Sequence, residues 1–376
     1  MQSVLGEIAK LRPGIPVDID CHNSNRYRLV VREKDGSRTA YYFSMPIYNI
    51  KTRKIVDVRF HLNGQSICAT GSNTDIILND YIFMENTEGV FSMRLHEKPV
   101  MFSPNEVQYG FNRVYPTTNG VAVKCDVKKN ESNSFIIETG KSHLNIRAND
   151  RCFALMQEEF RPFVVVSCMG STDETGSVIS PAKLDYQKID DKKYSISLYS
   201  TNSLAQYVLF EVNMYEKKIF QDTTVESANP FTNNAFGGVG FIGNSSEYGE
   251  QWLYSRIDFS RIPEVFDRYV NRVVLQIPKL NQNNVEISGF KVLARFCSFG
   301  SNWNNKIADG DCTAQSITSN FYHSMDITSL LRDIRTKTIV PSEGLILKSK
   351  IKGSGFSVIA TGDSYYTPQI LEINYR

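Results

Sequence analysis

The feature that most constrains the fold of this chain is a regular alternation of apolar and polar residues in many short runs. Successive side chains of a β-strand point to opposite faces, so a period of two describes a strand with one face on a core. The runs at 55–62, 194–198 and 253–259 follow this rule. In the first run Val56, Val58, Phe60 and Leu62 fall on one face. The pattern predicts an all-β fold of antiparallel sheets stacked as sandwiches.

Turn and helix signals agree with that fold class. Asp-Gly at 35–36 and Asn-Gly at 63–64 and 119–120 suit the left-handed positions of tight turns. Their spacing fits many short strands better than alternating strands and helices. Helical patterns are few, and the sequence predicts short helices only within 1–11, 263–270 and 327–334.

The domain organisation follows from length and from breaks in the strand pattern. A chain of 376 residues is longer than one ordinary domain. Breaks after residue 101 and after residue 217 predict β-rich segments at 1–101 and 102–217 and a sandwich at 218–376. The first two segments are allowed to form one unit, because neither shows a complete set of strands. The Asn-, Gly- and Ser-rich stretch 226–249 is expected to be a surface loop of the third.

Composition limits which classes of partner are expected. Hydrophobic residues make up 41% and charged residues 22% of the chain, and the formal net charge is +2. Such a balance gives no long-range attraction to nucleic acid, so none is expected as a partner. No apolar run approaches the roughly 20 residues that span a bilayer, and residues 1–11 lack the apolar core of a signal peptide. The sequence therefore predicts neither a membrane span nor a secretion signal in this chain.

Motifs that carry catalysis or metal binding are weak. The stretch Gly238–Gly243 matches G-x-G-x-x-G, but its flanks lack the strand and helix that a dinucleotide loop needs, so a flexible loop is favoured. The histidines show no metal-ligand spacing. The adjacent carboxylates at 158–159 and 190–191 are poorly spaced for glycoside hydrolysis. The sequence leaves an enzyme uncertain and leans against one.

The seven cysteines are scattered without a pairing motif. Free thiols are the favoured interpretation, with Cys125 on the buried face of an alternating run. If one bridge exists, the best pair is Cys297 with Cys312, a pairing that only geometry can test.

The order of elements in the last part of the chain is similar to that of a known family. It comprises Asp222-Thr223-Thr224-Val225, a glycine-containing loop, Arg256-Ile257-Asp258-Phe259 before Pro263, Asp326-Ile327-Thr328 before a short helix, and a closing strand from Pro368 to Tyr375. Residues 218–376 resemble the DNRLRE family in this order. The resemblance implies a jelly-roll sandwich with one or two short helices, of the kind found as accessory modules in bacterial cell-surface proteins. It also implies an extracellular or particle-associated location.

The resemblance raises two kinds of site. Jelly rolls of the carbohydrate-binding type often hold a structural Ca²⁺, which needs several oxygen ligands, although no cofactor is required. The candidate calcium ligands are Asp222, Asp258, Asp311 and Asp363, and a surface pair of Asp258 with Arg256 is the alternative. A sugar platform needs exposed rings, and the candidates are Trp303, Tyr365, Tyr366 and Tyr248. Packing of these rings in the core is the competing interpretation.

Three functions remain open. The first is a non-catalytic structural or adhesive sandwich protein of a bacterial surface or particle, with surface proteins or a homo-oligomer as partners. The second is a carbohydrate-binding protein that takes polysaccharide through the C-terminal jelly roll. The third is a glycan-active enzyme built on the N-terminal β segments, and it predicts carboxylates that converge in a cleft.

Overall fold

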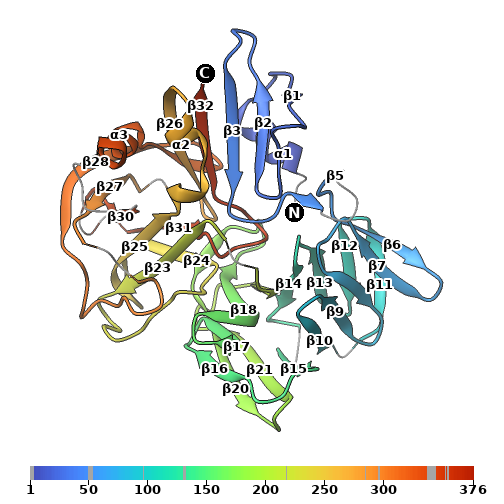
Figure 1. The fold of residues 1–376 in the computed structure, drawn as a ribbon. Coiled ribbons are helices and arrows are strands. Elements are labelled where there is room, and N and C mark those ends of the chain that lie inside the picture. The colour runs from blue at the N-terminus through green and yellow to red at the C-terminus, as the bar shows by residue number, and fades with distance from the viewer. Residues whose placement is uncertain are drawn as a thin grey trace. The chain divides into compact units, whose positions relative to one another are not determined.

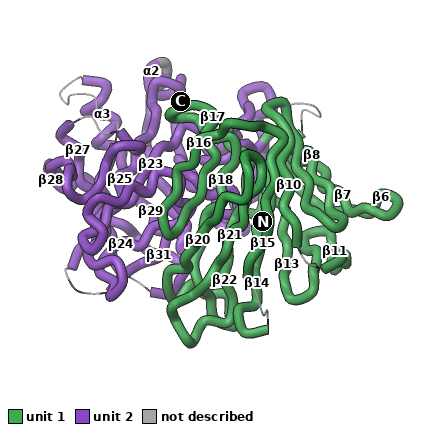
Figure 2. The backbone as a smooth tube through the Cα atoms, turned by 90° about the horizontal axis from the view of Figure 1, so that it is seen from below, with its two compact units in different colours: residues 1–8, 48–217 green, residues 9–47, 218–376 purple. Residues whose placement is uncertain are grey.

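The computed structural model describes residues 4–49, 54–95, 97–129, 133–216, 218–283, 285–294, 297–336, 344–351, 353 and 355–376. They form an all-β structure of antiparallel sheets with short helices, as predicted. The chain divides into two compact units, which Figure 2 colours separately. Unit 1 contains residues 1–8 and 48–217, and unit 2 contains residues 9–47 and 218–376.

Unit 1 is a sandwich of two antiparallel sheets. In spatial order, its first sheet contains β20 (Ala182–Lys188), β21 (Lys193–Ser200), β15 (Ser134–Thr139), β10 (Gly89–Arg94), β9 (Ile82–Asn86), β8 (Asp75–Leu78), β7 (Ser66–Thr70) and β6 (Arg59–Asn63). Its second sheet contains β11 (Pro99–Ser103), β12 (Glu106–Tyr109), β13 (Asn112–Pro116), β14 (Gly120–Asp126), β22 (Tyr207–Met214), β18 (Arg161–Thr172), β17 (Cys152–Glu158) and β16 (Asn145–Ala148). The short strand β19 (Val178–Ser180) pairs with β18, and β4 (Tyr48–Asn49) pairs with β5 (Lys54–Ile55).

One continuous core fills the space between these sheets. Phe135 of the first sheet stacks on Phe210 of the second, with ring centroids 5.1 Å apart. The predicted alternation at 194–198 is confirmed, because Tyr194, Ile196 and Leu198 are all buried. The part of the predicted segment 1–101 from Phe60 onward therefore shares a core with the segment 102–217, and the boundary after residue 101 falls inside β11.

Unit 2 is built from one antiparallel sheet that folds over on itself. In spatial order it contains β1 (Asp18–Ile19), β2 (Arg28–Arg32), β3 (Arg38–Phe43), β32 (Ile370–Tyr375), β26 (Val270–Pro278), β29 (Tyr322–Asp326), β28 (Asp309–Thr318), β27 (Ile287–Val292), β30 (Gly344–Ser349), β25 (Gly249–Ile257), β24 (Val239–Ser245) and β31 (Phe356–Ala360), with β23 (Phe220–Glu226) paired to β25. The fold occurs at β28, whose first half pairs with β27 and whose second half pairs with β29. Both halves of the sheet contribute to one core.

The strand order of unit 2 is that of a jelly roll, with β3 as its first strand. Eight strands are counted in sequence order, namely β3, β25, β26, β27, β28, β29, β30 and β32. In space, one half of the sheet has the order first, eighth, third, sixth (β3, β32, β26, β29). The other half has the order second, seventh, fourth, fifth (β25, β30, β27, β28). Two interleaved halves of this kind define the jelly roll, here extended by β1, β2, β23, β24 and β31.

The first jelly-roll strand therefore comes from outside the predicted segment 218–376. Figure 1 shows β3 beside β32, and six residue pairs from Arg38 with Tyr375 to Phe43 with Ile370 join them. Ala40 and Tyr42 lie in the same core as Leu371 and Ile373. Residues 9–47 thus belong to unit 2, and residues 48–217 of unit 1 lie in the sequence between the first and second jelly-roll strands.

Each of the three predicted helices is present in the described residues, and the second is shorter than predicted while the third begins one residue later and ends two residues later. They are α1 (Val4–Leu11), α2 (Glu264–Asp267) and α3 (Thr328–Thr336), with a 3-10 turn at Phe259–Arg261. Asp326 accepts hydrogen bonds from the backbone N–H and the hydroxyl of Thr328, at 3.0 and 2.6 Å, which holds the start of α3.

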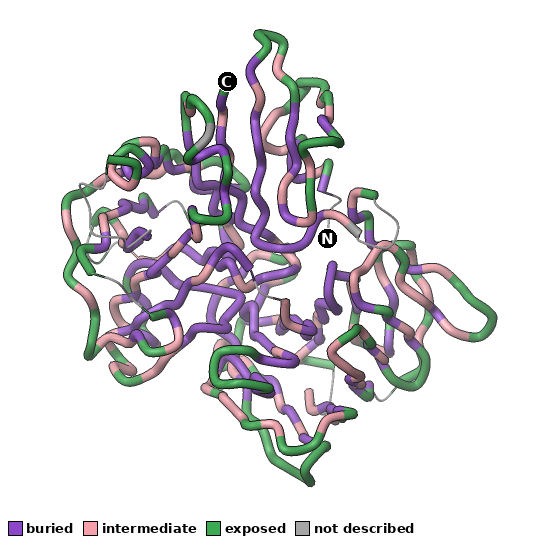
Figure 3. The backbone as a smooth tube through the Cα atoms, in the orientation of Figure 1, coloured by how far each residue is buried: buried purple, intermediate pink, exposed green. Residues whose placement is uncertain are grey.

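Some predicted positions differ, for local reasons. Leu62 is 68% exposed instead of facing the core, because it lies in a hairpin beside the Asn63-Gly64 turn, and exposed positions gather at such hairpin tips (Figure 3). The stretch 226–249 contains β24 and is not only a surface loop. Gly243 there has a φ of +125°, and a Cβ would lie 2.2 Å from the Gly355 carbonyl oxygen, so glycine is required by packing and not by phosphate binding.

Candidate functional site

An aromatic surface lies on the outer side of β25 in unit 2. Trp252 of β25 and Trp303 of the loop before β28 meet with ring centroids 4.8 Å apart and planes at 53°. Both rings are half-buried. Beneath them lie four buried residues, namely Val225, Tyr254, Val292 and Ile346. We call Trp252, Trp303 and the lysines beside them the tryptophan surface.

The layer beneath the tryptophan surface explains a difference from the predicted pattern. Alternation in 253–259 places Tyr254 on the solvent face, but its side chain is fully buried. Its hydroxyl donates to the Ile307 carbonyl at 3.0 Å. Burial raises the pKa of Tyr254 to about 12, so it stays a neutral donor. The strand is therefore covered on both faces, and the tryptophans form the outer layer.

Two lysines border the indole rings. The Lys348 ammonium lies 3.6 Å from the Trp252 ring centroid and also pairs with Asp309 at 2.9 Å. Burial opposes ionisation of Asp309, but the hydrogen bond and charge of Lys348 outweigh it and hold the pKa of Asp309 below its usual value. Lys306 is exposed and lies 4.5 Å from the Trp303 centroid. Trp252 donates its indole N–H to Glu250 at 2.9 Å.

The other predicted sugar-stacking rings do not join this surface. Tyr248 is 1% exposed and contacts Phe241 at 6.1 Å between centroids, so it belongs to the interior. Tyr365 is 3% exposed and lies under the Lys218 ammonium. Neither ring has a free face to stack on a sugar, which corrects the prediction for both. Tyr366 is half-buried. Of the four predicted rings, Trp303 alone is placed with another indole at a surface among the described residues.

A second cluster is buried where β23 begins. The Lys218 side chain is 1% exposed, and its ammonium donates to the Gly362 carbonyl at 2.9 Å. It lies 3.7 Å from Oδ1 of Asp363 and 3.8 Å from the centroid of the Tyr365 ring. Asp222 lies in the same cluster and accepts a short hydrogen bond from the Gly362 backbone N–H. We call Lys218, Asp222, Asp363 and Tyr365 the lysine–aspartate cluster.

The two carboxyl groups of this cluster differ in their surroundings. Burial raises the pKa of Asp222 well above its usual value, and the nearby Asp363 raises it further. The Gly362 N–H and the Lys218 charge oppose that shift without cancelling it. Burial at this position therefore favours the protonated form of Asp222. The Asp363 side chain is 13% exposed and faces the ammonium.

The predicted calcium ligands do not come together as one set. Asp222 and Asp363 are neighbours, but Lys218 directs its own positive charge at the Gly362 carbonyl and at Asp363. Asp258 bonds Ser260 before the 3-10 turn, and Asp311 is exposed on β28. Across the described ranges, no three His, Cys, Asp or Glu side chains are grouped to hold a metal ion. A calcium site at these residues therefore stays a prediction, and the Lys218 ammonium would compete with a cation beside Asp363.

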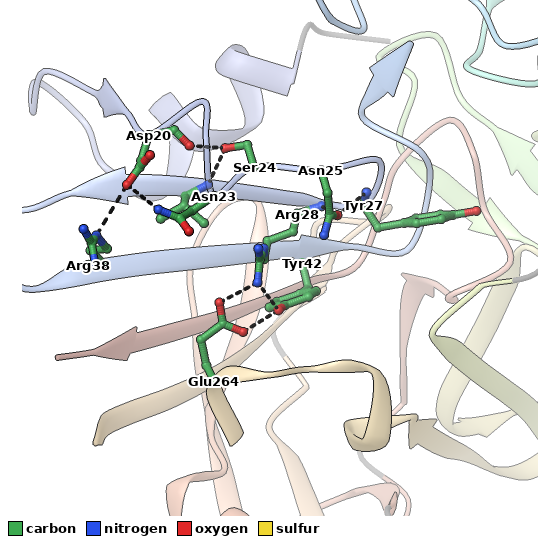
Figure 4. A network of polar contacts seen from close by, with 10 residues as sticks. Asp20, Asn23, Ser24, Asn25, Tyr27, Arg28, Arg38, Tyr42 and Glu264 are labelled. Carbon is green, nitrogen blue, oxygen red and sulfur yellow. Dashed lines mark hydrogen bonds and ion pairs between the residues drawn. The ribbon is translucent and has the colours of Figure 1, made fainter. Parts of the chain in front are cut away.

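A third polar network joins the hairpin of β2 and β3, which we call the N-terminal hairpin, to α2 (Figure 4). Glu264 of α2 is 4% exposed at its side chain and accepts from Arg28 of β2 at 2.9 Å and from the Tyr42 hydroxyl at 2.5 Å. Burial together with the Glu264 charge raises the pKa of Tyr42 far above its usual value, so this hydroxyl remains a donor. Between β1 and β2, Asp20 is 2% exposed and accepts from Asn23 at 2.9 Å. Glu264 accepts from Arg28 and Tyr42, and Asp20 accepts from Asn23, which assigns the network a structural role.

The remaining chemical groups are dispersed. The carboxylates at 158–159 and 190–191 are exposed, and Asp191 pairs with Lys188 at 2.8 Å. All seven cysteines are free, with Cys125, Cys152 and Cys168 buried and Cys297 and Cys312 exposed without a bridge. Burial raises the pKa of the Cys125 thiol to about 12, which leaves it unreactive. His96 lies outside the described residues.

Comparisons with known proteins add no identity. No protein-family model matches the chain, and no curated protein matches it. The DNRLRE resemblance of residues 218–376 therefore stays a prediction. None of the helices in the described part is both long and apolar enough to cross a membrane.

Sequence reasoning missed the lysine–aspartate cluster. Lys218 stands next to Lys217, and two adjacent lysines are typical of a solvated boundary. The available signal was the spacing of Lys218, Phe220 and Asp222, which period two places on one face of a strand with an apolar residue between the charges. That spacing indicates a buried pair only once Phe220 is known to face the core.

Proposed function

We propose that the chain is a non-catalytic adhesive protein of a surface or particle, and that its jelly-roll unit binds carbohydrate through the tryptophan surface. The observation that carries the proposal is the contact of Trp252 with Trp303 on the outer side of β25. Both indoles are held by the buried layer below them and are half-exposed. The fold-level resemblance supports the surface location by analogy alone.

Sugars bind such surfaces for a physical reason. The C–H face of a pyranose is apolar and stacks on an indole, and a ring already fixed by packing loses little conformational entropy on binding. Phe231, 75% exposed, lies in the neighbouring loop, where the Pro230 carbonyl accepts from the Asn304 N–H at 3.0 Å. A third ring beside the tryptophans would extend contact over more than one sugar unit.

The charges favour an acidic polysaccharide. Lys348 is neutralised by Asp309, whereas Lys306 is exposed beside Trp303. A uronic-acid carboxylate could take a charge-assisted hydrogen bond from Lys306 while its ring stacks on the indole. The ligand class that fits best is therefore a polysaccharide of acidic sugars.

Affinity electrophoresis of the full chain in gels that contain soluble polysaccharides tests this proposal. We expect retardation by an acidic polysaccharide such as polygalacturonate, and less by a neutral glucan. The Trp303→Ala variant should lose the retardation, and Lys306→Ala should weaken it for the acidic polysaccharide only. Tyr269→Ala removes another exposed ring of unit 2 and should behave like the wild type. Equal retardation of Trp303→Ala and the wild type would refute the assigned surface.

A purely structural role is the second candidate. It is favoured by the division of the chain, which passes between unit 1 and unit 2 after residues 8, 47 and 217 and so joins them by three chain connections. A protein that acts as a spacer or particle component in this way is expected to assemble. Native mass spectrometry of the full chain should then show a closed homo-oligomer. A monomer at all concentrations, together with retardation by polysaccharide, would decide against this candidate.

A further inference from the structure

Burying the charged groups of the lysine–aspartate cluster costs free energy, and apolar residues would fill the same space without that cost. Removing an ammonium and a carboxylate from water is unfavourable unless the pair has excellent geometry and further hydrogen bonds. Here the Lys218 side chain is 1% exposed, and its ammonium stands 3.7 Å from Oδ1 of Asp363. A second carboxyl, Asp222, is fully buried beside them. The arrangement calls for another explanation than stability.

The geometry suits a reaction between the amine and one carboxyl. The Gly362 carbonyl fixes the Lys218 nitrogen at 2.9 Å, and the Tyr365 ring covers it at 3.8 Å. The approach needed for attack is about 3–3.5 Å, so a small movement brings the nitrogen to the Asp363 carboxyl carbon. Gly362 leaves space for the Asp222 carboxyl, because a Cβ at residue 362 would lie 3.0 Å from Oδ2 of Asp222.

We propose that Lys218 and Asp363 form an intramolecular amide bond, with Asp222 as the group that transfers the protons. This inference does not depend on carbohydrate binding. Asp363 is the acceptor because it faces the ammonium, whereas Asp222 accepts from the Gly362 backbone N–H. Asp222 is the acid–base group because it is fully buried beside Asp363, where burial favours its protonated form.

The reaction balances without an oxidant or a cofactor. Exchange of one proton within the cluster converts the ammonium to the amine, which attacks Cγ of Asp363 to form the N–C bond. Asp222 delivers its proton to one Asp363 oxygen and takes one from the nitrogen. The Cγ–O bond then breaks and water leaves. One nitrogen–carbon bond has formed, one carbon–oxygen bond has broken, and Asp222 ends in its starting state.

The position of the bond gives it a mechanical consequence. Lys218 directly precedes β23, and Asp363 lies between β31 and β32. An amide between them joins the point where the chain re-enters unit 2 to the connection that leads into the closing strand. Pulling on residues near the C-terminus could then no longer separate β23 from that connection. Such a lock suits a protein that bears load at a surface.

Intact-mass spectrometry of the reduced and denatured full chain tests the proposal. We expect the wild type to be lighter than its sequence by one water molecule. Digestion should yield one branched peptide in which the Lys218 side chain is linked to Asp363. The variants Lys218→Met, Asp363→Ala and Asp222→Ala should each have the full mass of their sequence.

The wild-type measurement stands even if a variant fails to fold. Full mass in the folded wild type, with separate peptides for Lys218 and Asp363, would overturn the proposal. Loss of water can also arise from succinimide at Asp-Gly sequences such as Asp35-Gly36. That loss would persist in Lys218→Met and map to another peptide, and this outcome would equally overturn the proposal.

Discussion

Replacing His323 should remove most of the acid sensitivity of unit 2 between pH 6.5 and 4. His323 lies on β29 and is fully buried, between the Thr318 hydroxyl at 2.9 Å and the Ser357 hydroxyl at 2.8 Å. Burial, with a smaller contribution from the Lys279 charge, lowers the pKa of His323 from 6.5 to about 4. The folded protein therefore keeps this imidazole neutral at pH values where the unfolded chain protonates it.

The sign and size follow from proton linkage. Above pH 6.5 both states are neutral at this residue, and its full contribution to stability is present. As the pH falls from 6.5 toward 4, the unfolded state gains a proton that the folded state does not, so the free energy of unfolding decreases. A difference of about 2.5 pKa units corresponds to roughly 3 kcal/mol, reached near pH 4 and constant below it.

Urea denaturation followed by tryptophan fluorescence measures this effect selectively. The chain has two tryptophans, Trp252 and Trp303, and both lie in unit 2. His323→Gln keeps a donor and an acceptor but does not titrate, so its free energy of unfolding should fall by about 2 kcal/mol less than that of the wild type between pH 7 and 4.5. His22→Gln, at an exposed residue, is the control and should follow the wild type. Identical pH dependence of wild type and His323→Gln would refute the reasoning.

Two further changes test the packing of unit 2 by the same assay. Glu264→Ala leaves the largely buried Arg28 without its carboxylate and should lower the free energy of unfolding by about 3 kcal/mol. Glu286→Ala breaks an exposed pair with Lys350 and should lower it by under about 1 kcal/mol. Equal losses would contradict the assigned role of Glu264. Gly243→Ala should lower the free energy of unfolding by at least about 1–3 kcal/mol, because φ is +125° and the new Cβ would meet the Gly355 carbonyl. Gly300→Ala, with open space around it, should be nearly neutral. A neutral Gly243→Ala would show that the pairing of β24 with β31 is absent.

The strands and their buried faces could be predicted from sequence where one face meets a core. Ile196 in unit 1 follows the alternation because its strand, β21, has a single core face. Tyr254 could not be predicted as buried, because its burial depends on Trp303, about fifty residues further along the chain. Period two identifies a strand and its faces, but it does not show what covers the second face.

Strand partners were the main gap in the prediction. Nothing in residues 38–43 identifies 370–375 as their neighbour, because backbone hydrogen bonds are the same for every sequence and the pairing spans nearly the whole chain. The sequence pattern therefore groups the N-terminal hairpin with the predicted segment 1–101. The same limit applied to the candidate sites, since Lys218 and Asp363 meet only through the paths of β23 and β31.

Hydrogen–deuterium exchange of the full chain tests whether β3 is the first strand of the jelly roll. The Ala40 and Tyr42 region pairs with β32 and lies in its core, so its amides should be as protected in native buffer as those of β26 and β32. With increasing urea, β3, β26 and β32 should lose protection together. Rapid exchange of β3 in native buffer, while β26 and β32 stay protected, would contradict the account.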